Sequence, residues 1–303
     1  MPLPGAARIL DRLVEQSSTR STAGNRSIAV GLVGRGIQAS RSPIMHEREG
    51  ARLGISYRYV LIDFDELQLP DSALGEIVDA AQRLGFAGLN VTHPFKQSVT
   101  ALLTRLADDA AVIGAVNTVV FAEGERVGYN TDSGGFAESF SESMTGCSLQ
   151  NVLQLGAGGA GMAVAHALFK LGAEQVTVFD TDEVRSRHLA ATLRDRMGKR
   201  VEVAPSPAAA IAQAGGLVNT TPVGMAKYPG MPIRADLLSP RQWVAEIIYF
   251  PAETELVQRA RALGCRTLTG TGMAVYQAVL AFELFAGVSA DRTAMSGYFE
   301  TAA

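Results

Sequence analysis

The chain has 303 residues, 47% of them hydrophobic, which is enough for two domains that each bury a core. Its formal net charge of −3 gives no basic surface for nucleic acid, and no apolar run is long enough to span a bilayer. Cys147 and Cys265 match no metal or redox spacing, and the N-terminus has no signal-peptide core. We therefore expect a cytoplasmic globular protein without nucleic-acid or membrane partners; a disulfide stays an open alternative.

Residues 1–26 are expected to form a peripheral extension. A partly disordered tail and a docked amphipathic helix are equally good interpretations of this segment. The helix would have one apolar face, made of Ile9, Leu10, Leu13 and Val14.

From Ser27 onward, strand and helix patterns alternate, which predicts an α/β fold. The expected strands are 27–33, 57–62 and 87–91, the expected helices are 43–53, 72–84 and 95–103, and 116–121 should form a hairpin with 126–129, turned at Glu123–Gly124. A helix over 133–143 should lead into the next domain.

The stretch 151–182, NVLQLGAGGAGMAVAHALFKLGAEQVTVFDTD, is the most informative part of the chain. A strand at 151–155 leads into a G-x-G-x-x-G turn, then a helix at 162–171 and a second strand at 175–179 that ends at Asp180. The turn consists of Gly156, Ala157, Gly158, Gly159, Ala160 and Gly161. In such a unit the pyrophosphate binds at the helix N-terminus, and the acid accepts hydrogen bonds from ribose hydroxyls. The pattern predicts a Rossmann-type doubly wound parallel sheet that binds a dinucleotide; a purely structural glycine turn is the alternative.

The acids at this strand end favour NAD as the cofactor. Asp180 and Asp182 would repel the 2′-phosphate of NADP, and no Lys or Arg stands in their place. Arg185 and Arg187 follow on the next helix, so NADP is less favoured but stays an alternative.

The alternation continues to the C-terminus, with helices at 183–197, 253–263 and 273–286 and strands at 200–203, 215–219, 243–247 and 265–268. The nucleotide unit starts mid-chain, after a complete α/β segment. Two α/β domains should therefore flank a cleft, with ligands bound near the carboxyl ends of the strands.

Several polar residues stand where strands end or helices begin. Lys96, in NVTHPFK (90–96), lies at an expected helix start, whose positive end destabilises an ammonium, so it is a candidate general acid/base. A surface lysine is the simpler interpretation. Asp132 could orient this amine or cap the following helix, and Asn117 suits a ligand contact or a turn bond.

Ser40 and Ser42 precede a helix that starts at Pro43, where hydroxyls and N–H groups suit a carboxylate or cap the helix. His93 is a weaker candidate for a proton relay. The other histidines are expected to be packing or surface residues: His46, His166 and His188. No metal is expected, because no set of His, Cys and carboxylates has ligand spacing.

A series of motifs between about Ile28 and Phe285 resembles the shikimate/quinate dehydrogenase family. The motifs are SRSP (40–43), NVTHPFK (90–96), GAVNT (114–118), NTD (130–132), GAGGAG (156–161), NTTPVGM (219–225) and GTGMAVYQ (270–277). The resemblance implies that Lys96 and Asp132 are the catalytic pair. It also implies a discontinuous catalytic domain, 27–132 plus 271–303, and an NAD-binding domain, 133–270.

The resemblance also implies roles for the binding residues. Those implied to hold the substrate carboxylate are Ser40, Ser42 and Tyr249; those implied to bind ring hydroxyls with the catalytic pair are Thr92, Asn117 and Gln277. Those implied to line the cofactor, besides the glycine turn, are Asp180, Arg185, Thr221 and Gly270.

The chain departs from the biosynthetic NADP-using members, which resemble N-R-T where it has Asp180-Thr181-Asp182. The stretches IYFP (248–251) and TEL (254–256) are more similar to NAD-dependent quinate/shikimate enzymes. Some quinate-preferring members carry Thr in place of Ser42, which favours shikimate slightly here. Ser133 stands where many relatives have Gly, and little effect is expected.

We therefore expect an NAD-dependent oxidoreductase that interconverts shikimate and 3-dehydroshikimate, and also quinate and 3-dehydroquinate. The alternatives are a dehydrogenase of a related cyclic polyol acid (aminoshikimate-like), an NADP-dependent biosynthetic shikimate dehydrogenase, and a non-catalytic dinucleotide-binding regulator. A monomer or homodimer is expected, and the physiological direction stays open.

Overall fold

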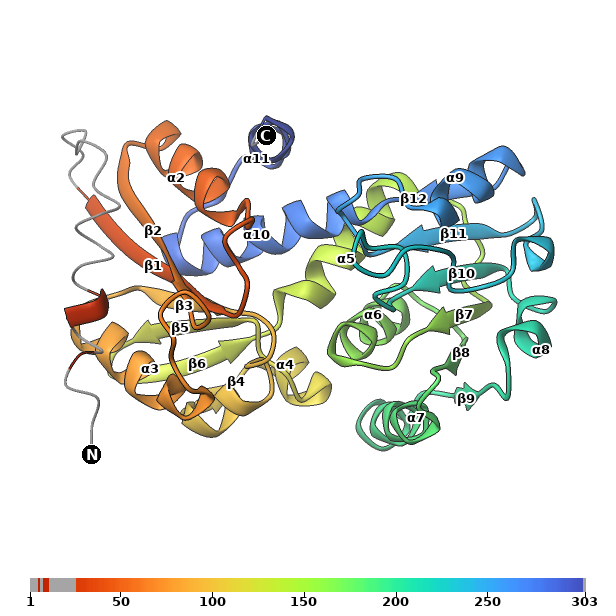
Figure 1. The fold of residues 1–303 in the computed structure, drawn as a ribbon, viewed down its shortest axis with the longest axis horizontal. Helices are drawn as coiled ribbons and strands as arrows, with labels where there is room; N and C mark the ends of the chain where they lie inside the picture. The colour runs from red at the N-terminus through yellow and green to blue at the C-terminus, as the bar shows by residue number, and fades with distance from the viewer. Residues whose placement is uncertain (1–4, 6–7, 11–25, 302–303) are drawn as a thin grey trace. The chain divides into compact units, whose positions relative to one another are not determined.

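The computed structural model describes residues 5, 8–10 and 26–301, which divide into two α/β units (Figure 1). The first unit consists of Met1–Thr131 together with Ala278–Ala303, and the second consists of Asp132–Gln277. Each unit has a six-stranded sheet. The expected α/β class is confirmed.

The first unit has a mixed sheet in the order β2-β1-β3-β5-β6-β4. Its strands are β1 (Arg26–Gly34), β2 (Ile55–Asp63), β3 (Gly88–Val91), β4 (Arg105–Leu106), β5 (Thr118–Ala122) and β6 (Glu125–Tyr129). Its helices are α2 (Ser42–Arg52), α3 (Leu74–Arg83), α4 (Asp108–Ile113), α11 (Arg292–Glu300) and the C-terminal part of α10 (Gly270–Ala286). β1 pairs in parallel with β2 and β3, and β5 pairs antiparallel with β3 and β6.

The central strand β1 is a nearly continuous apolar run, as expected for a strand flanked on both sides by parallel partners. On β3, Gly88 makes room for a neighbour, since a Cβ there would lie 2.4 Å from the ring of Phe285 on α10. Leu10 is fully buried in a hydrophobic core cluster of the first unit that includes Leu89 of β3, and Ile9 packs against this cluster. This part of the N-terminal extension is therefore docked; Leu13 and Val14 lie outside the described residues.

The second unit has an all-parallel sheet in the order β12-β11-β10-β7-β8-β9 (Figure 1). Its strands are β7 (Asn151–Leu155), β8 (Gln175–Phe179), β9 (Val201–Val203), β10 (Gly216–Asn219), β11 (Trp243–Glu246) and β12 (Arg266–Leu268). Its helices are α5 (Thr131–Ser143), α6 (Gly159–Lys170), α7 (Glu183–Met197), α8 (Pro207–Ile211), α9 (Glu255–Ala262) and the first part of α10. The strand order reverses between β7 and β10, which confirms the doubly wound Rossmann-type sheet and places its ligand crevice there.

The helix expected over 95–103 is wrong in extent. The structure has a turn followed by a short 3₁₀ helix, Ser98–Leu102. The Ser98 hydroxyl donates to the Phe95 carbonyl at 3.3 Å, and the Thr100 hydroxyl donates to the Gln97 carbonyl at 2.6 Å. These side chains compete for the carbonyl groups that an α-helix would use.

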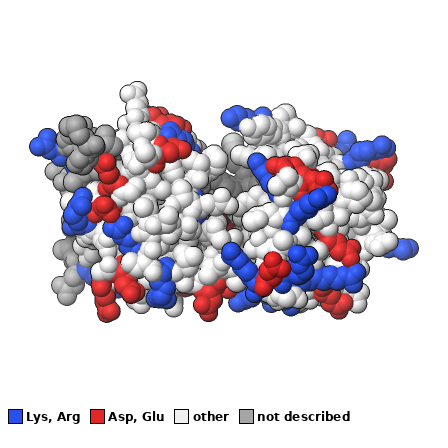
Figure 2. Space-filling model, turned by 90° about the horizontal axis from the view of Figure 1, so that it is seen from below, with Lys and Arg blue, Asp and Glu red and all other residues white. Residues whose placement is uncertain are grey.

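No helix in the described part of the chain is long and apolar enough to cross a membrane. Lys and Arg side chains are interspersed with Asp and Glu over the face in Figure 2. Cys147 and Cys265 are both free thiols, so the disulfide alternative is wrong.

Candidate active site

The glycine turn joins β7 to α6 at the switch point of the second sheet. Gly156 has a φ of +98°, and a Cβ on it would lie 2.6 Å from the Thr220 hydroxyl oxygen. A Cβ on Gly161 would lie 2.6 Å from the Gly156 carbonyl oxygen. Gly158 and Gly159 are exposed, and a Cβ on either would meet nothing within 4 Å. The first pair makes the turn tight and the second leaves its outer side open, as a bound pyrophosphate requires.

A buried amide that the sequence analysis did not single out supports this turn. Gln154, inside β7, donates from Nε2 to the carbonyls of Gly156 and Gly161, both at 2.9 Å. The Thr220 hydroxyl donates to the Gly156 carbonyl at 2.9 Å. The signal available in the sequence was the amide of Gln154 between the apolar residues Leu153 and Leu155.

Asp180 lies against the glycine turn. Its Oδ2 accepts the Ala157 N–H at 2.8 Å, and its Oδ1 accepts the Asp182 N–H at 2.9 Å. Asp182 caps α7 through the Val184 N–H at 3.0 Å, and its carboxylate pairs with the exposed Arg185 at 3.2 Å. The strand end therefore presents two carboxylates, and its nearby arginine is paired with one of them.

The loops after β10 and β11 carry further predicted residues. Thr221 donates from N–H and hydroxyl to Asn219 Oδ1, at 3.0 and 2.7 Å. Gly270 begins α10 against the β11 loop, where a Cβ would lie 2.4 Å from the Ile247 carbonyl oxygen. Tyr249, on that loop, is 46% exposed.

In the first unit, backbone hydrogen bonds join the loops after β1 and β3. The Arg35 N–H donates to the His93 carbonyl at 3.1 Å, and the Thr92 N–H donates to the Val33 carbonyl at 2.9 Å. The Val116 N–H donates to the Lys96 carbonyl at 2.8 Å, which fixes the Lys96 turn against the segment before β5. These bonds bring together the segments of the predicted residues Ser40, Ser42, Thr92, Lys96 and Asn117.

Phe95, the residue before Lys96, anchors this turn in the core of the first unit. Phe95 is buried, and its ring packs on Phe64 with centroids 4.6 Å apart. The sequence predicted that the positive end of a helix destabilises the Lys96 ammonium. No α-helix starts at Lys96, so this effect does not apply. Lys96 is half-buried.

A polar network runs beneath these loops. The buried Tyr59 phenol donates to Asn90 Oδ1 at 2.9 Å, and Asn90 Nδ2 donates to the Thr118 hydroxyl at 3.0 Å. Burial raises the pKa of Tyr59 well above its ordinary value and outweighs the lowering effect of the nearby Ser42 hydroxyl, so the phenol stays protonated. The alternative that Ser40 or Ser42 caps α2 does not hold. The N-cap residue is Arg41, whose side chain makes no cap hydrogen bond, and the Ser40 hydroxyl accepts the Ser42 N–H at 3.3 Å.

Asn117 ties the start of β5 to the start of α5. Its Oδ1 accepts the Thr131 N–H at 2.8 Å, and its Nδ2 donates to the Thr131 hydroxyl at 2.9 Å. Asp132 follows Thr131 and lies in the first turn of α5, so the expected helix cap at Asp132 is wrong. Because Asp132 and Gln277 belong to the second unit, their pairing with Lys96 and the other first-unit residues stays a prediction.

Two histidines are buried in the described structure. Nδ1 of His46 lies 3.0 Å from the Tyr57 hydroxyl, and burial lowers its pKa to about 3. Nδ1 of His166 lies 2.8 Å from the Ser133 hydroxyl, so Ser133 links α5 to α6. No group of three or more His, Cys, Asp or Glu in the described residues could hold a metal ion.

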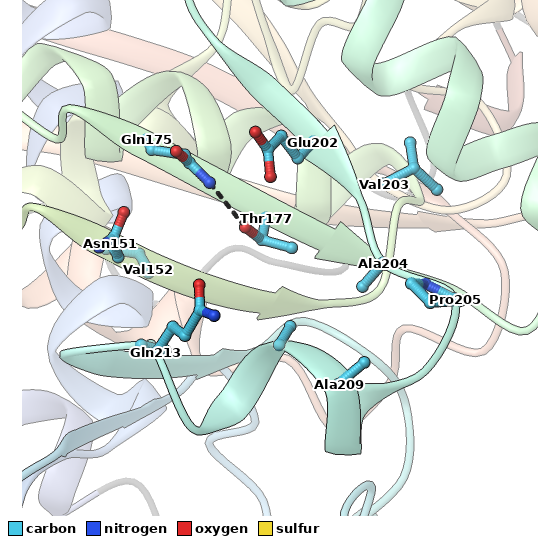
Figure 3. Close-up of a pocket in the computed structure, with 12 residues that line it drawn as sticks. Asn151, Val152, Gln175, Thr177, Glu202, Val203, Ala204, Pro205, Ala209 and Gln213 are labelled. Carbon is cyan, nitrogen blue, oxygen red and sulfur yellow. Dashed lines mark hydrogen bonds between the residues drawn. The ribbon is translucent and has the colours of Figure 1, made fainter.

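A hollow of about 160 Å³ lies between the strands β7, β8 and β9 and the helix α8 (Figure 3). Asn151 and Gln175 begin β7 and β8, and Gln175 donates to the Thr177 hydroxyl at 3.3 Å. No residue of the glycine turn lines this hollow.

The fold and the glycine turn together define a dinucleotide-binding protein. The model of the shikimate dehydrogenase substrate binding domain matches residues 32–119, and that of the shikimate 5′-dehydrogenase C-terminal domain matches 270–296. A shikimate dehydrogenase (NADP(+)) of Streptomyces avermitilis is 52% identical over 89% of this chain and 94% of its own length. A quinate/shikimate dehydrogenase (NAD(+)) of Corynebacterium efficiens is 44% identical over 90% of this chain and 98% of its own.

A solved quinate dehydrogenase from Corynebacterium glutamicum in complex with NAD superposes with a TM-score of 0.88. It is 43% identical, and the match covers 91% of this chain and 100% of that one. The chain belongs to the shikimate dehydrogenase family, and the resemblance drawn from its motifs is confirmed.

Proposed function

We propose that this chain oxidises one ring hydroxyl of shikimate, and also of quinate, with NAD⁺ as the hydride acceptor. The names of the relatives that match along most of the chain support this substrate class. The choice of NAD is carried by the Asp180 carboxylate, which the Ala157 N–H holds against the glycine turn. A carboxylate there accepts hydrogen bonds from ribose hydroxyls.

NADP is the second candidate cofactor, because the relative from Streptomyces avermitilis is named as an NADP(+) enzyme. The strand end argues against it. Asp180 and Asp182 would repel a 2′-phosphate, and Arg185 is already paired with Asp182.

When bound, NAD⁺ supplies the hydride acceptor, while the protein supplies position and proton transfer. In the proposed reaction neutral Lys96 takes the proton from the substrate hydroxyl, and in the reverse direction its ammonium returns it. The role proposed for Asp132, which the motif resemblance implies, is to orient the Lys96 amine.

Other side chains hold the substrate in place. Ser42 lies at the start of α2, and together with Ser40 and Tyr249 it binds the substrate carboxylate in this proposal. The proposed partners of the ring hydroxyls are Thr92, Asn117 and Gln277.

Initial rates with shikimate or quinate, each with NAD⁺ and NADP⁺, test the assignment. We expect turnover with NAD⁺, little with NADP⁺, and the higher kcat/KM with shikimate. Equal or faster rates with NADP⁺ would overturn the choice of cofactor. Retained NAD⁺ binding without turnover of either acid would favour a related polyol acid as substrate or a non-catalytic regulator.

Replacing Lys96 with Ala should lower kcat by about a hundredfold or more, as for loss of a general acid/base. NAD⁺ affinity should change little. Lys170→Ala, at an exposed position at the end of α6, is the matched control and should keep wild-type rates. Near-wild-type turnover of Lys96→Ala would remove Lys96 from the mechanism.

A further inference from the structure

Glu246, the last residue of β11, is a buried carboxylate at the centre of a hydrogen-bond cluster. Both of its oxygens accept from Asn219 Nδ2 at 3.0 Å. Oε1 also accepts the Ile248 N–H at 3.1 Å, and Oε2 accepts the Thr254 hydroxyl at 3.0 Å. One side chain therefore joins the end of β10, the loop after β11 and the start of α9.

The Asn219 amide links Glu246 to the loop after β10. Its Oδ1 accepts the N–H and the hydroxyl of Thr221, and its Nδ2 donates to the Val223 carbonyl at 3.0 Å. The Thr221 hydroxyl oxygen in turn accepts the Val223 N–H at 3.2 Å. The carboxylate of Glu246 therefore orients Asn219, and Asn219 orients the loop that carries Thr221.

This loop lies in the half of the sheet that should take the nicotinamide end. A doubly wound sheet binds a dinucleotide across its switch point, with one mononucleotide on each half. Asp180 and the glycine turn belong to the β7-β8-β9 half, where ribose recognition places the adenosine end. The Glu246 cluster joins β10 and β11 in the other half (Figure 1).

We propose that Glu246 is a positioning residue that holds the β10 and β11 loops in the arrangement that binds the nicotinamide half of the cofactor. This inference rests on the proposed dinucleotide site and adds to it a residue that touches neither cofactor nor substrate. All groups that donate to Glu246 are uncharged, and each of their bonds needs an acceptor. The carboxamide of Glu246→Gln would turn an NH₂ group toward some of these donors, so part of the hydrogen bonds in the cluster would be lost.

The test compares the binding of NAD⁺ and ADP-ribose to the full-length protein by isothermal titration calorimetry. ADP-ribose keeps the adenosine, both phosphates and both riboses but lacks nicotinamide. In Glu246→Gln we expect the Kd for NAD⁺ to rise about tenfold while the Kd for ADP-ribose stays within about twofold. Glu246→Asp keeps the charge on a shorter side chain and should recover part of the NAD⁺ affinity.

Val244→Ala is the matched control, because Val244 is fully buried on the same strand and its side chain belongs to the core. It weakens β11 and should leave both affinities unchanged. Equal losses for NAD⁺ and ADP-ribose in Glu246→Gln, or no loss for either, would overturn the proposal. If Glu246→Gln does not fold, the same comparison in Glu246→Asp decides it.

A pH series gives a readout that general loss of structure would not produce. Burial raises the pKa of Glu246 to about 7, against the lowering effect of the bonds from Asn219, Ile248 and Thr254. The ratio of NAD⁺ to ADP-ribose affinity should therefore fall from pH 8 to pH 6 in the wild type and stay flat in Glu246→Gln. A wild type that binds NAD⁺ but turns over neither acid would defeat the proposed function and leave this test decisive. A wild type that binds no NAD⁺ would overturn both.

Discussion

Asp180 does two things that substitutions can separate. It accepts the Ala157 N–H, which shapes the glycine turn, and in the proposed site its negative charge would face the ribose. Asp180→Asn keeps an acceptor oxygen and removes the charge, whereas Asp180→Ala removes both. Two unit charges at close range near a protein surface interact by about 4 kcal/mol, so repulsion of a 2′-phosphate is large enough to set the cofactor.

We expect both substitutions to narrow the ratio of kcat/KM for NAD⁺ over NADP⁺ by about tenfold or more. Asp180→Ala should also weaken NAD⁺ binding, because the glycine turn loses the hydrogen bond from the Ala157 N–H to this carboxylate. Asp195→Asn removes a charge from an exposed position on the following helix, α7, and serves as control. A ratio unchanged from wild type in Asp180→Asn would refute the role of charge at this position.

At the scale of elements, each unit fixes a loop with a buried carboxylate at the end of a strand. In the first unit this is Asp63, at the end of β2. It accepts the N–H groups of Gly36 and Ile37 at 3.0 and 2.9 Å, and Gln38 Nε2 at 3.0 Å. Burial alone would raise the pKa of Asp63, but these bonds outweigh it and lower the pKa. The loop so held leads directly to Ser40 and Ser42.

Replacing Asp63 with Asn should raise KM for shikimate about tenfold and leave KM for NAD⁺ within about twofold, because the serine loop loses acceptors while the second unit is untouched. Steady-state kinetics with each substrate varied in turn measures both constants. Asp65→Asn, exposed and paired with Arg35 at 2.6 Å, is the control and should behave as wild type. A rise in KM for NAD⁺ as large as that for shikimate would contradict this role of Asp63.

The elements also show where sequence reasoning succeeds. The strand, turn, helix and strand around Asp180 are contiguous, so local pattern alone predicted them, and β8 and α7 begin and end where expected. The pairs Tyr59–Asn90 and Asn219–Glu246 join strands far apart in the chain, and no spacing reveals which polar residues meet. The helix expected over 95–103 is wrong because the hydroxyls of Ser98 and Thr100 bond to carbonyl groups of that turn, and the short helices α4 and α8 were not predicted.

At the scale of the whole molecule, His46 makes stability depend on pH. It is fully buried among the rings of Tyr57, Tyr59 and Phe282, and burial lowers its pKa to about 3 from an ordinary value of 6.5. The unfolded chain takes up a proton below pH 6.5 that the folded protein does not. The contribution of neutral His46 to the free energy of unfolding is therefore fully present above pH 6.5 and is lost as the pH falls toward 3.

Urea unfolding at pH 6.5 and pH 5 should show a loss of about 2 kcal/mol in the free energy of unfolding that is attributable to His46. His46→Gln carries no such charge and should lose less between the same pH values. His188→Gln, at an exposed position on α7, should follow the wild type. Identical pH slopes for wild type and His46→Gln would show that His46 does not control acid stability.

The contact of Phe285 with Gly88 has a consequence for how the protein is made. The second unit is one continuous segment, Asp132–Gln277, and its last residue is synthesised before Ala278–Ala303. The first unit emerges from the ribosome before the second, yet its core lacks Phe282 and Phe285 until the whole second unit has been synthesised. The domain that is started first is therefore finished last, and nascent chains that stop short of residue 278 should carry a folded second unit behind an incomplete first one.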